Sequence, residues 1–219
     1  MHGFDGDTIV QSALAELDPW RHWRIEIKKQ TPIAAGLGGG SSDAATALRL
    51  ANAQLDRPLS PPELHALAAR LGADVPFFLV DGPQLGTGDG TELEALDLPQ
   101  DFTVLLFLPV GAHKRSTADV YAAFDAREGA VGFAERAAVL RAELAAVRRP
   151  RDLAALPRND LASSRFADRI MALGAFRADV SGAGPTVYGL FHHRGDARRA
   201  ERALRGLGRS WITVPAWYG

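Results

Sequence analysis

The chain has 219 residues, 47% of them hydrophobic and 23% charged, which is enough to bury a core in one or two domains. Its net charge of −1 excludes the basic excess that a nucleic-acid partner requires, and the absence of cysteine excludes disulfides, cysteine-ligated zinc and thiol catalysis. No apolar run reaches the length of a membrane span and the first residues do not form a signal peptide, so we expect a cytoplasmic protein without membrane contacts.

The first predicted elements surround a glycine-rich segment. Apolar residues at helical spacing predict an amphipathic helix over residues 8–17. Residues Trp23–Lys28 alternate strictly between apolar and polar and predict a half-buried strand of an antiparallel or mixed sheet. A further helix after the glycines is indicated by apolar residues that share one of its faces, namely Ala44, Ala45, Leu48, Ala51 and Leu55.

The glycine-rich segment, Pro32–Ser42, predicts a phosphate or nucleotide site. Glycines allow positive φ angles and a close approach of the backbone to an anion, and the free N–H groups of the following helix point toward it. A Walker A loop is excluded because no lysine lies between Thr31 and Asp43. The dinucleotide fingerprint is also excluded, because Ser41 stands where its third glycine would be.

The polar residues at the start of this helix each have two interpretations. Ser41 and Ser42 can cap the helix, contact phosphate oxygens or a magnesium ion, or do both. Asp43 suits the first turn because the helix dipole favours an acid there, and it is also a candidate neighbour of a metal. No histidine spacing indicates a metal site formed by protein side chains.

The next predicted elements surround Asp74. Ser60 and Glu63 match a capping box at the start of a helix that Gly72 ends, and the apolar run Phe77–Val80 predicts a buried strand. Asp74 can be an ordinary turn residue. It can also be functional, because a carboxylate at the inner end of a buried strand is costly without a partner.

The rest of the chain predicts a hairpin, a domain boundary and a second domain. Glycines and prolines between residues 82 and 90 indicate the hairpin, and the boundary is expected between residues 96 and 101. Beyond it, strands are predicted at 103–108, 178–181, 186–191 and 211–214, and helices at 117–125, 133–148, 162–173 and 196–207.

Three segments resemble the GHMP kinases. Pro32–Ala45 is similar to their phosphate-binding motif, Leu71–Phe78 to the segment that supplies the catalytic aspartate, and Val180–Thr186 to their C-terminal glycine-rich loop. The resemblance implies an α+β fold of two domains. Residues 1–97 would form an ATP-binding part of the ribosomal protein S5 domain 2-like type, and residues 98–219 a ferredoxin-like domain.

The resemblance also implies roles for particular residues. Asp74 would be the catalytic base and would contact the substrate. Gly182, Ala183 and Gly184 would also contact the substrate, from a loop that faces the first glycine loop; a plain hairpin is the alternative for this loop. ATP, with Mg²⁺, would bind the residues of the first loop, which are Pro32, Ile33, Ala34, Ala35, Gly36, Leu37, Gly38, Gly39, Gly40, Ser41 and Ser42.

Within the family, three adjacent glycines followed by Ser-Ser-Asp are most similar to the members that act on 4-diphosphocytidyl-2-C-methyl-D-erythritol. The implied activity is ATP-dependent phosphorylation of the 2-hydroxyl of this cytidine diphosphate-linked alcohol, in non-mevalonate isoprenoid precursor synthesis, by a monomer or a homodimer. Two alternatives stay open. One is a GHMP kinase for another small alcohol, and the other is a non-catalytic nucleotide-binding fragment.

The second alternative arises because the family's first strand, with its catalytic lysine, has no counterpart before the glycine loop. No lysine precedes Lys28, and the tyrosine–histidine pair that contacts cytidine in the family is missing. The resemblance therefore implies a truncated N-terminal part. It also implies that the 219-residue chain on its own has little kinase activity.

Overall fold

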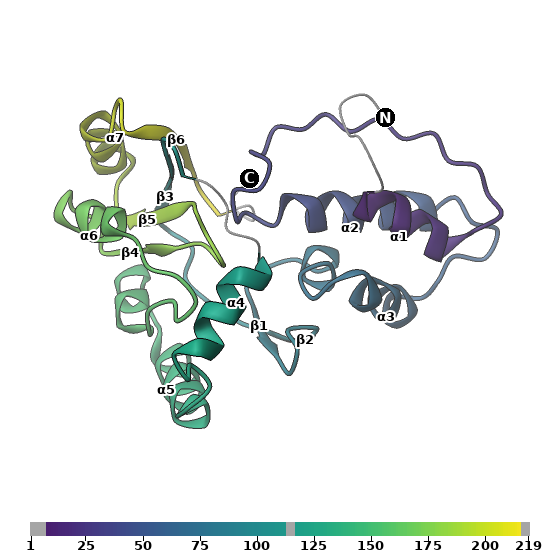
Figure 1. Ribbon diagram of the computed structural model, residues 1–219, viewed down its shortest axis with the longest axis horizontal. Coiled ribbons are helices and arrows are strands. Elements are labelled where there is room, and N and C mark those ends of the chain that lie inside the picture. Colours follow the sequence, from purple (N-terminus) through teal and green to yellow (C-terminus); the bar gives the residue numbers. More distant parts are fainter. Residues whose placement is uncertain (1–7, 113–116, 216–219) are drawn as a thin grey trace. The chain divides into compact units, whose positions relative to one another are not determined.

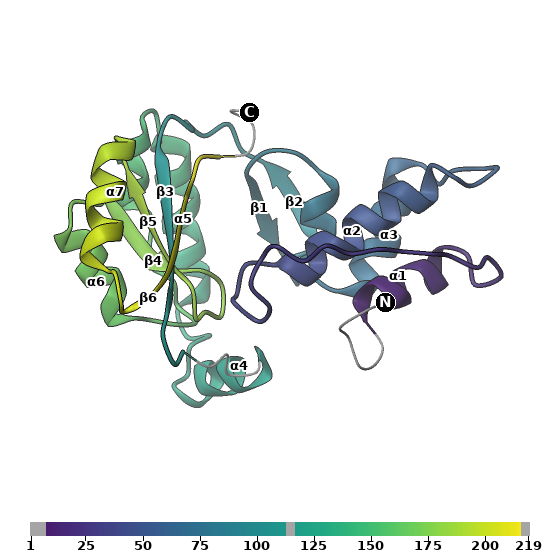
Figure 2. The same cartoon turned by 90° about the horizontal axis from the view of Figure 1, so that it is seen from above.

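The structure is a computed structural model that describes residues 8–112 and 117–215. In these two stretches each helix is too short or too polar to cross a lipid bilayer. The chain forms two compact units (Figures 1 and 2). Unit 1 comprises Met1–Ile33 and Gly38–Asp97, and unit 2 comprises Ala34–Leu37 and Leu98–Gly219.

Unit 1 is built around three helices whose apolar faces meet. The predicted helical spacing is confirmed for Ala44, Ala45, Leu48 and Ala51, which are all buried in this core. Leu55 was also predicted on this face, but it lies beyond the end of the helix at Asn52 and is only partly buried. The elements described in unit 1 are α1 (Ile9–Leu17), α2 (Gly39–Asn52), α3 (Pro61–Leu71), the 3₁₀ helix η1 (Pro76–Leu79) and the antiparallel hairpin of β1 (Gln84–Thr87) and β2 (Glu92–Ala95).

The start of α3 follows the capping pattern predicted from the sequence. The carboxylate of Glu63 accepts hydrogen bonds from the Ser60 hydroxyl at 2.6 Å and from the Ser60 N–H at 2.8 Å. These bonds favour the charged form and hold the pKa of Glu63 below its ordinary value. The cap therefore stabilises the fold at neutral pH, and this contribution is lost as the pH falls through the lowered pKa.

Residues 23–30 do not form the predicted strand. They are extended and their burial alternates, with Trp23, Ile25 and Ile27 packed against the core of unit 1. No strand pairs with them among the described residues. The alternation predicted the apolar face correctly, whereas a strand also needs a hydrogen-bonded neighbour, and periodicity says nothing about one.

The predicted strand Phe77–Val80 is also wrong, because the chain forms η1 there. Pro76 lacks an N–H and has a fixed φ, which suits the first position of a helical turn. Phe77 is 36% exposed and Val80 42% exposed, so the run is not buried as a strand would be. Asp74 is correspondingly exposed and does not lie at the inner end of a strand.

Unit 2 contains the predicted ferredoxin-like arrangement. Its four antiparallel strands lie in the order β4-β5-β3-β6, and α6 and α7 pack on one face of the sheet (Figure 2). The other face packs against η2 and the residues before it. The elements described in unit 2 are β3 (Thr103–Pro109), α4 (Thr117–Ala126), α5 (Phe133–Ala146), η2 (Pro150–Ala155), α6 (Arg165–Ala172), β4 (Arg177–Val180), β5 (Val187–Phe191), α7 (Arg194–Ala203) and β6 (Gly208–Thr213).

The packing of α6 on the sheet depends on a glycine in β5. A methyl group on Gly189 would lie 2.4 Å from Cγ2 of the fully buried Ile170. We expect Gly189→Ala to lower the free energy of unfolding by about 1–3 kcal/mol, as overpacked cores do. Gly195→Ala in α7 is the control, because its nearest atom is 4.0 Å away; alanine there should stabilise by up to about 1 kcal/mol. Urea denaturation measures the free energy of unfolding of both variants. An equal change in this free energy in the two variants would contradict the packing argument.

Candidate functional site

The start of α2 supplies donors for an anion. Gly38 is the N-cap and has a φ of +62°, and the first intrahelical bond runs from the Ser42 N–H to the Gly38 carbonyl at 2.9 Å. The N–H groups of Gly39, Gly40 and Ser41 come before this bond and are not used by the helix. Together with the positive end of the helix dipole, they form an arrangement suited to phosphate.

The two serines do not cap α2 as the sequence allowed. They lie in its first turn, and the cap position is held by Gly38, which makes no side-chain bond. Both serines are partly buried, and neither hydroxyl has a hydrogen-bond partner among the described residues. The hydroxyls of Ser41 and Ser42 are therefore available to an oxygen-rich ligand or to a cation.

Asp43 is paired with a lysine, a contact that the sequence analysis missed. The Lys29 ammonium forms an ion pair with the Asp43 carboxylate and donates to the Gly39 carbonyl at 3.1 Å. The two side chains are only 19% and 29% exposed. The pair ties the extended segment to the start of α2, and it gives Asp43 a lysine as its neighbour. A spacing of 14 residues between extended chain and helix follows no periodicity, so the sequence carried no signal for it.

The segment that carries Asp74 packs against the phosphate loop inside unit 1. A methyl group on Gly38 would lie 2.7 Å from Cζ of Phe78, which shows how closely the Phe78 ring covers this glycine. Phe78 belongs to η1, and Asp74 lies in the turn just before η1. The Asp74 carboxylate is exposed and has no hydrogen bond or ion pair within the described parts of the chain. It is therefore free to contact a ligand.

In unit 2 the two glycine loops meet, as the resemblance implied. Gly36 has a φ of +73°, and its carbonyl accepts a hydrogen bond from the Ser181 hydroxyl at 2.8 Å. The Thr186 N–H donates to the carbonyl of Ala35 at 3.2 Å. The second loop is also a hairpin, because it joins β4 to β5. The prediction that the loops face each other is confirmed, whereas a contact with substrate stays a prediction.

A pocket of about 550 Å³ lies beside the second glycine loop in unit 2. Its walls come from this loop, from α4 and from the residues that lead into α6. Groups of acidic, histidine or cysteine side chains suited to a metal ion are absent from the described residues. The polar residues of the pocket wall are Arg127, Asn159, Asp160, Ser163, Ser164 and Arg165.

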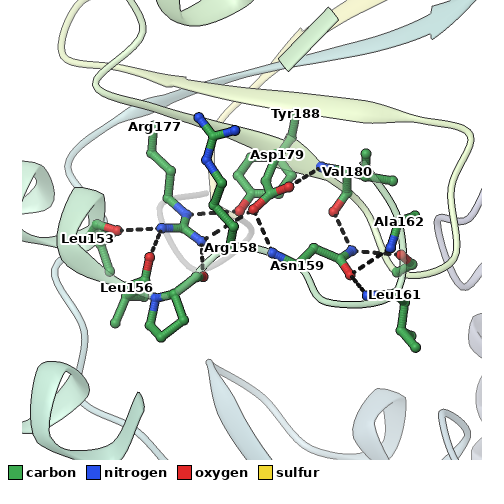
Figure 3. A network of polar contacts seen from close by, with 12 residues as sticks. Leu153, Leu156, Arg158, Asn159, Leu161, Ala162, Arg177, Asp179, Val180 and Tyr188 are labelled. Atoms are coloured by element: carbon green, nitrogen blue, oxygen red, sulfur yellow. Dashed lines mark hydrogen bonds and ion pairs between the residues drawn. The ribbon is translucent and has the colours of Figure 1, made fainter. Parts of the chain in front are cut away.

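A polar network behind this loop was not predicted from the sequence (Figure 3). It joins Asn159 to Asp179 and Arg177, which lie two residues apart in β4 and so on the same face of the strand. Two opposite charges on one face of a short buried strand were the available signal. Their partners were not predictable, because they come from a distant turn.

Comparisons with known proteins agree with this arrangement. Residues 8–82 match the family described as "GHMP kinases N terminal domain", and residues 154–210 match "GHMP kinases C terminal". A 4-diphosphocytidyl-2-C-methyl-D-erythritol kinase from Solidesulfovibrio magneticus is 40% identical over 207 residues, covering 87% of this chain and 68% of the relative. A crystal structure of 4-(cytidine 5'-diphospho)-2C-methyl-D-erythritol kinase has a TM-score of 0.74 and 30% identity, covering 98% of this chain and 80% of the other.

More distant structures share the fold alone. Mevalonate kinase from Methanococcus jannaschii has a TM-score of 0.70 at 15% identity, covering 93% of this chain and 72% of that one. The matches to both family models and to the curated relative define the class as an ATP-dependent small-molecule kinase. The chain belongs to the GHMP kinase family.

The contact between the glycine loops leaves no room for a side chain on Gly36. An added methyl group would lie 2.5 Å from the Gly184 carbonyl oxygen and 2.9 Å from that of Ser181. We expect Gly36→Ala to destabilise the protein by about 1–3 kcal/mol beyond the cost of its positive φ. Amide exchange at Thr186, whose N–H is bonded to Ala35, should accelerate in this variant.

The matched control is Gly174→Ala, because Gly174 has a φ of +100° and open space around it. This variant should cost only the strain of the left-handed backbone, about 1–2 kcal/mol. Urea denaturation and amide exchange compare the two proteins. Equal losses, with Thr186 exchange unchanged in both, would show that the loops do not depend on this contact.

Proposed function

We propose that this protein catalyses the ATP-dependent phosphorylation of the 2-hydroxyl of 4-diphosphocytidyl-2-C-methyl-D-erythritol, a step in non-mevalonate isoprenoid precursor synthesis. The observation that carries the proposal is the 40% identity to a kinase named for this substrate, over 87% of the chain. The solved kinase of the same name, at 30% identity, supports it. We also propose that the protein is cytoplasmic and acts as a monomer or a homodimer.

ATP would bind along the first glycine loop, residues 32–42. The unused amides at the start of α2 support this role, because they would donate to the phosphate oxygens. The hydroxyls of Ser41 and Ser42 fit Mg²⁺, which prefers oxygen ligands and is held largely through the phosphates of its nucleotide. When bound, Mg²⁺ would neutralise charge on the β- and γ-phosphates. Asp43 is left out of this ligand set because Lys29 is its partner.

Asp74 would act as the base. Its carboxylate would accept the proton of the 2-hydroxyl as the hydroxyl oxygen attacks the γ-phosphorus, while the bond to the β–γ bridging oxygen breaks and ADP leaves. The exposed carboxylate, without a partner in the described chain, supports this role. Gly182–Gly184 would contact the substrate from the ferredoxin-like domain, assigned to residues 98–219, and residues 1–97 would form the ATP-binding domain.

The proposal predicts ADP release that depends on the alcohol substrate. We expect kcat below the ~1–100 s⁻¹ typical of kinases, because no cation accompanies Asp74 in the described residues. Asp74→Asn should lower kcat by a further factor of about 100 or more, since asparagine cannot accept the proton. A coupled ADP-release assay with 4-diphosphocytidyl-2-C-methyl-D-erythritol, ATP and Mg²⁺ measures both values.

Two controls make the assay specific. Asp89→Asn removes another exposed carboxylate, one that is bonded to Thr91 in the hairpin, and should leave kcat unchanged. Mevalonate and homoserine in place of the substrate should give no ADP release. Turnover of either alcohol at a higher rate would contradict the proposed substrate, and equal turnover by the parent and Asp74→Asn would contradict the proposed base.

A further inference from the structure

The side chain of Asn159 is bonded to Val180, Leu161 and Ala162 (Figure 3). Asn159 also lines the pocket beside the second glycine loop. Its Nδ2 group donates to the carbonyls of Val180 at 3.0 Å and Gly182 at 2.7 Å. Its Oδ1 atom accepts from the N–H groups of Leu161 at 2.7 Å and Ala162 at 3.3 Å. An amide side chain has two donors and two acceptor positions, so all of its hydrogen-bonding capacity is used.

Asp179 holds the main chain of Asn159 in place. One carboxylate oxygen accepts the Asn159 N–H at 2.8 Å, and the other accepts the Val180 N–H at 2.8 Å. Asp179 is only 5% exposed, and a carboxylate so deeply buried is costly without an opposite charge. Arg177 supplies that charge, with its Nη2 atom 3.7 Å from Asp179 Oδ2.

Arg177 is in turn fixed to the turn that leads into Asn159. Its side chain is 12% exposed. The guanidinium donates to the carbonyls of Leu153, Leu156 and Pro157 at 3.1, 2.6 and 2.8 Å, and its Nε donates to the Tyr188 hydroxyl at 3.0 Å. The turn, β4 and the glycine loop are thereby connected through one set of polar contacts.

The glycine loop has little of its own to fix its conformation. Gly182 and Gly184 both have positive φ angles and lack side chains. The backbone bonds within the loop run from the Gly184 N–H to the Ser181 carbonyl and from the Ser181 N–H to the Thr186 carbonyl, both at 2.8 Å, and neither involves Gly182. Asn159 binds the carbonyls just before and inside the loop. Its loss would release both of them, and the direction of the following N–H groups would no longer be fixed.

We propose that Asn159 is a positioning residue for phosphoryl transfer, which orients Gly182–Gly184 toward the substrate and is itself held by Asp179 and Arg177. The inference rests on the proposed function, in which this loop contacts the substrate. Buried ion pairs often add little net stability, so a role in geometry accounts better for this network than a role in stability. Displacements of about 1 Å at such a position can cost about 100-fold in rate.

The test variant is Asn159→Asp. It keeps the acceptor for Leu161 and Ala162 but replaces the donor to Val180 and Gly182 with an oxygen that repels their carbonyls. We expect kcat/KM for the alcohol substrate to fall about 10- to 100-fold, with a lower kcat as well as a higher KM, and the KM for ATP to change less than threefold. Amide exchange at Gly184 should accelerate about tenfold or more.

The matched control is Asn52→Asp in unit 1. Asn52 is 9% exposed, and its side chain likewise donates to a carbonyl and accepts from an N–H, both of Leu59, at 3.0 and 2.7 Å. This variant should lose a similar amount of stability and keep kcat/KM within twofold. Asn159→Ala tests the same point with no repulsive oxygen, and Asn159→Asp carries the test if the alanine variant does not fold.

The outcomes separate the two proposals. Equal kcat/KM losses in Asn159→Asp and Asn52→Asp would overturn the positioning role, because stability alone would then explain them. Unchanged kcat/KM and unchanged Gly184 exchange in Asn159→Asp would also overturn it. Absence of turnover in the parent would instead contradict the proposed function, and Gly184 exchange would still decide whether Asn159 orients the loop.

Discussion

The constraint on which the glycine loops depend is the close approach of one backbone to another at Gly36. Its carbonyl accepts the Ser181 hydroxyl, and no side chain fits between Gly36 and the carbonyl of Gly184. Residues 34–37 cluster with unit 2 and α2 begins just after Gly38, so the glycine segment runs from one unit to the other within a few residues. Positive φ angles at Gly36 and Gly38 make this path possible.

The electrostatics at the start of α2 follow from this path. Since Gly38 holds the cap position without a side-chain bond, the first amides and the two serine hydroxyls remain free for phosphate oxygens. Lys29 compensates the charge of Asp43 and fastens the extended segment beside these donors. The helix that closes the core of unit 1 therefore also offers an anion-binding end. In the GHMP kinase family, this segment is the phosphate-binding motif.

Much of the fold could be predicted because its signals are local. The glycine spacing, the Ser60–Glu63 cap and the apolar face of α2 each depend on neighbours within a few residues. The strand predicted at Phe77–Val80 was wrong because a short apolar run fits a strand and a helical turn equally well. Pro76 favours the helical turn. The strand predicted at Trp23–Lys28 was wrong because a strand needs a second segment to pair with. The apolar periodicity of one segment does not show whether such a partner exists.

The parts of the candidate site that the sequence did not reveal all depend on distant contacts. Lys29 meets Asp43 across 14 residues, and Arg177 binds carbonyls 20 and 21 residues earlier in the chain. Asp74 was identified through a resemblance. Its environment was predicted wrongly, because a buried strand was expected next to it where the chain forms η1. A motif therefore indicated the chemistry, whereas the positions of its supporting residues followed only from the tertiary structure.

The central claim is that the contact between the two glycine loops positions the phosphate loop, and calorimetric titration with a non-hydrolysable ATP analogue and Mg²⁺ tests it most directly. The parent should bind one nucleotide, and Ser181→Ala, which removes the bond to Gly36, should bind it about 2- to 12-fold more weakly, the range expected for one neutral hydrogen bond. Ser12→Ala on the exposed side of α1 should bind as the parent does. Absence of binding by the parent, or equal affinity in Ser181→Ala, would contradict the account.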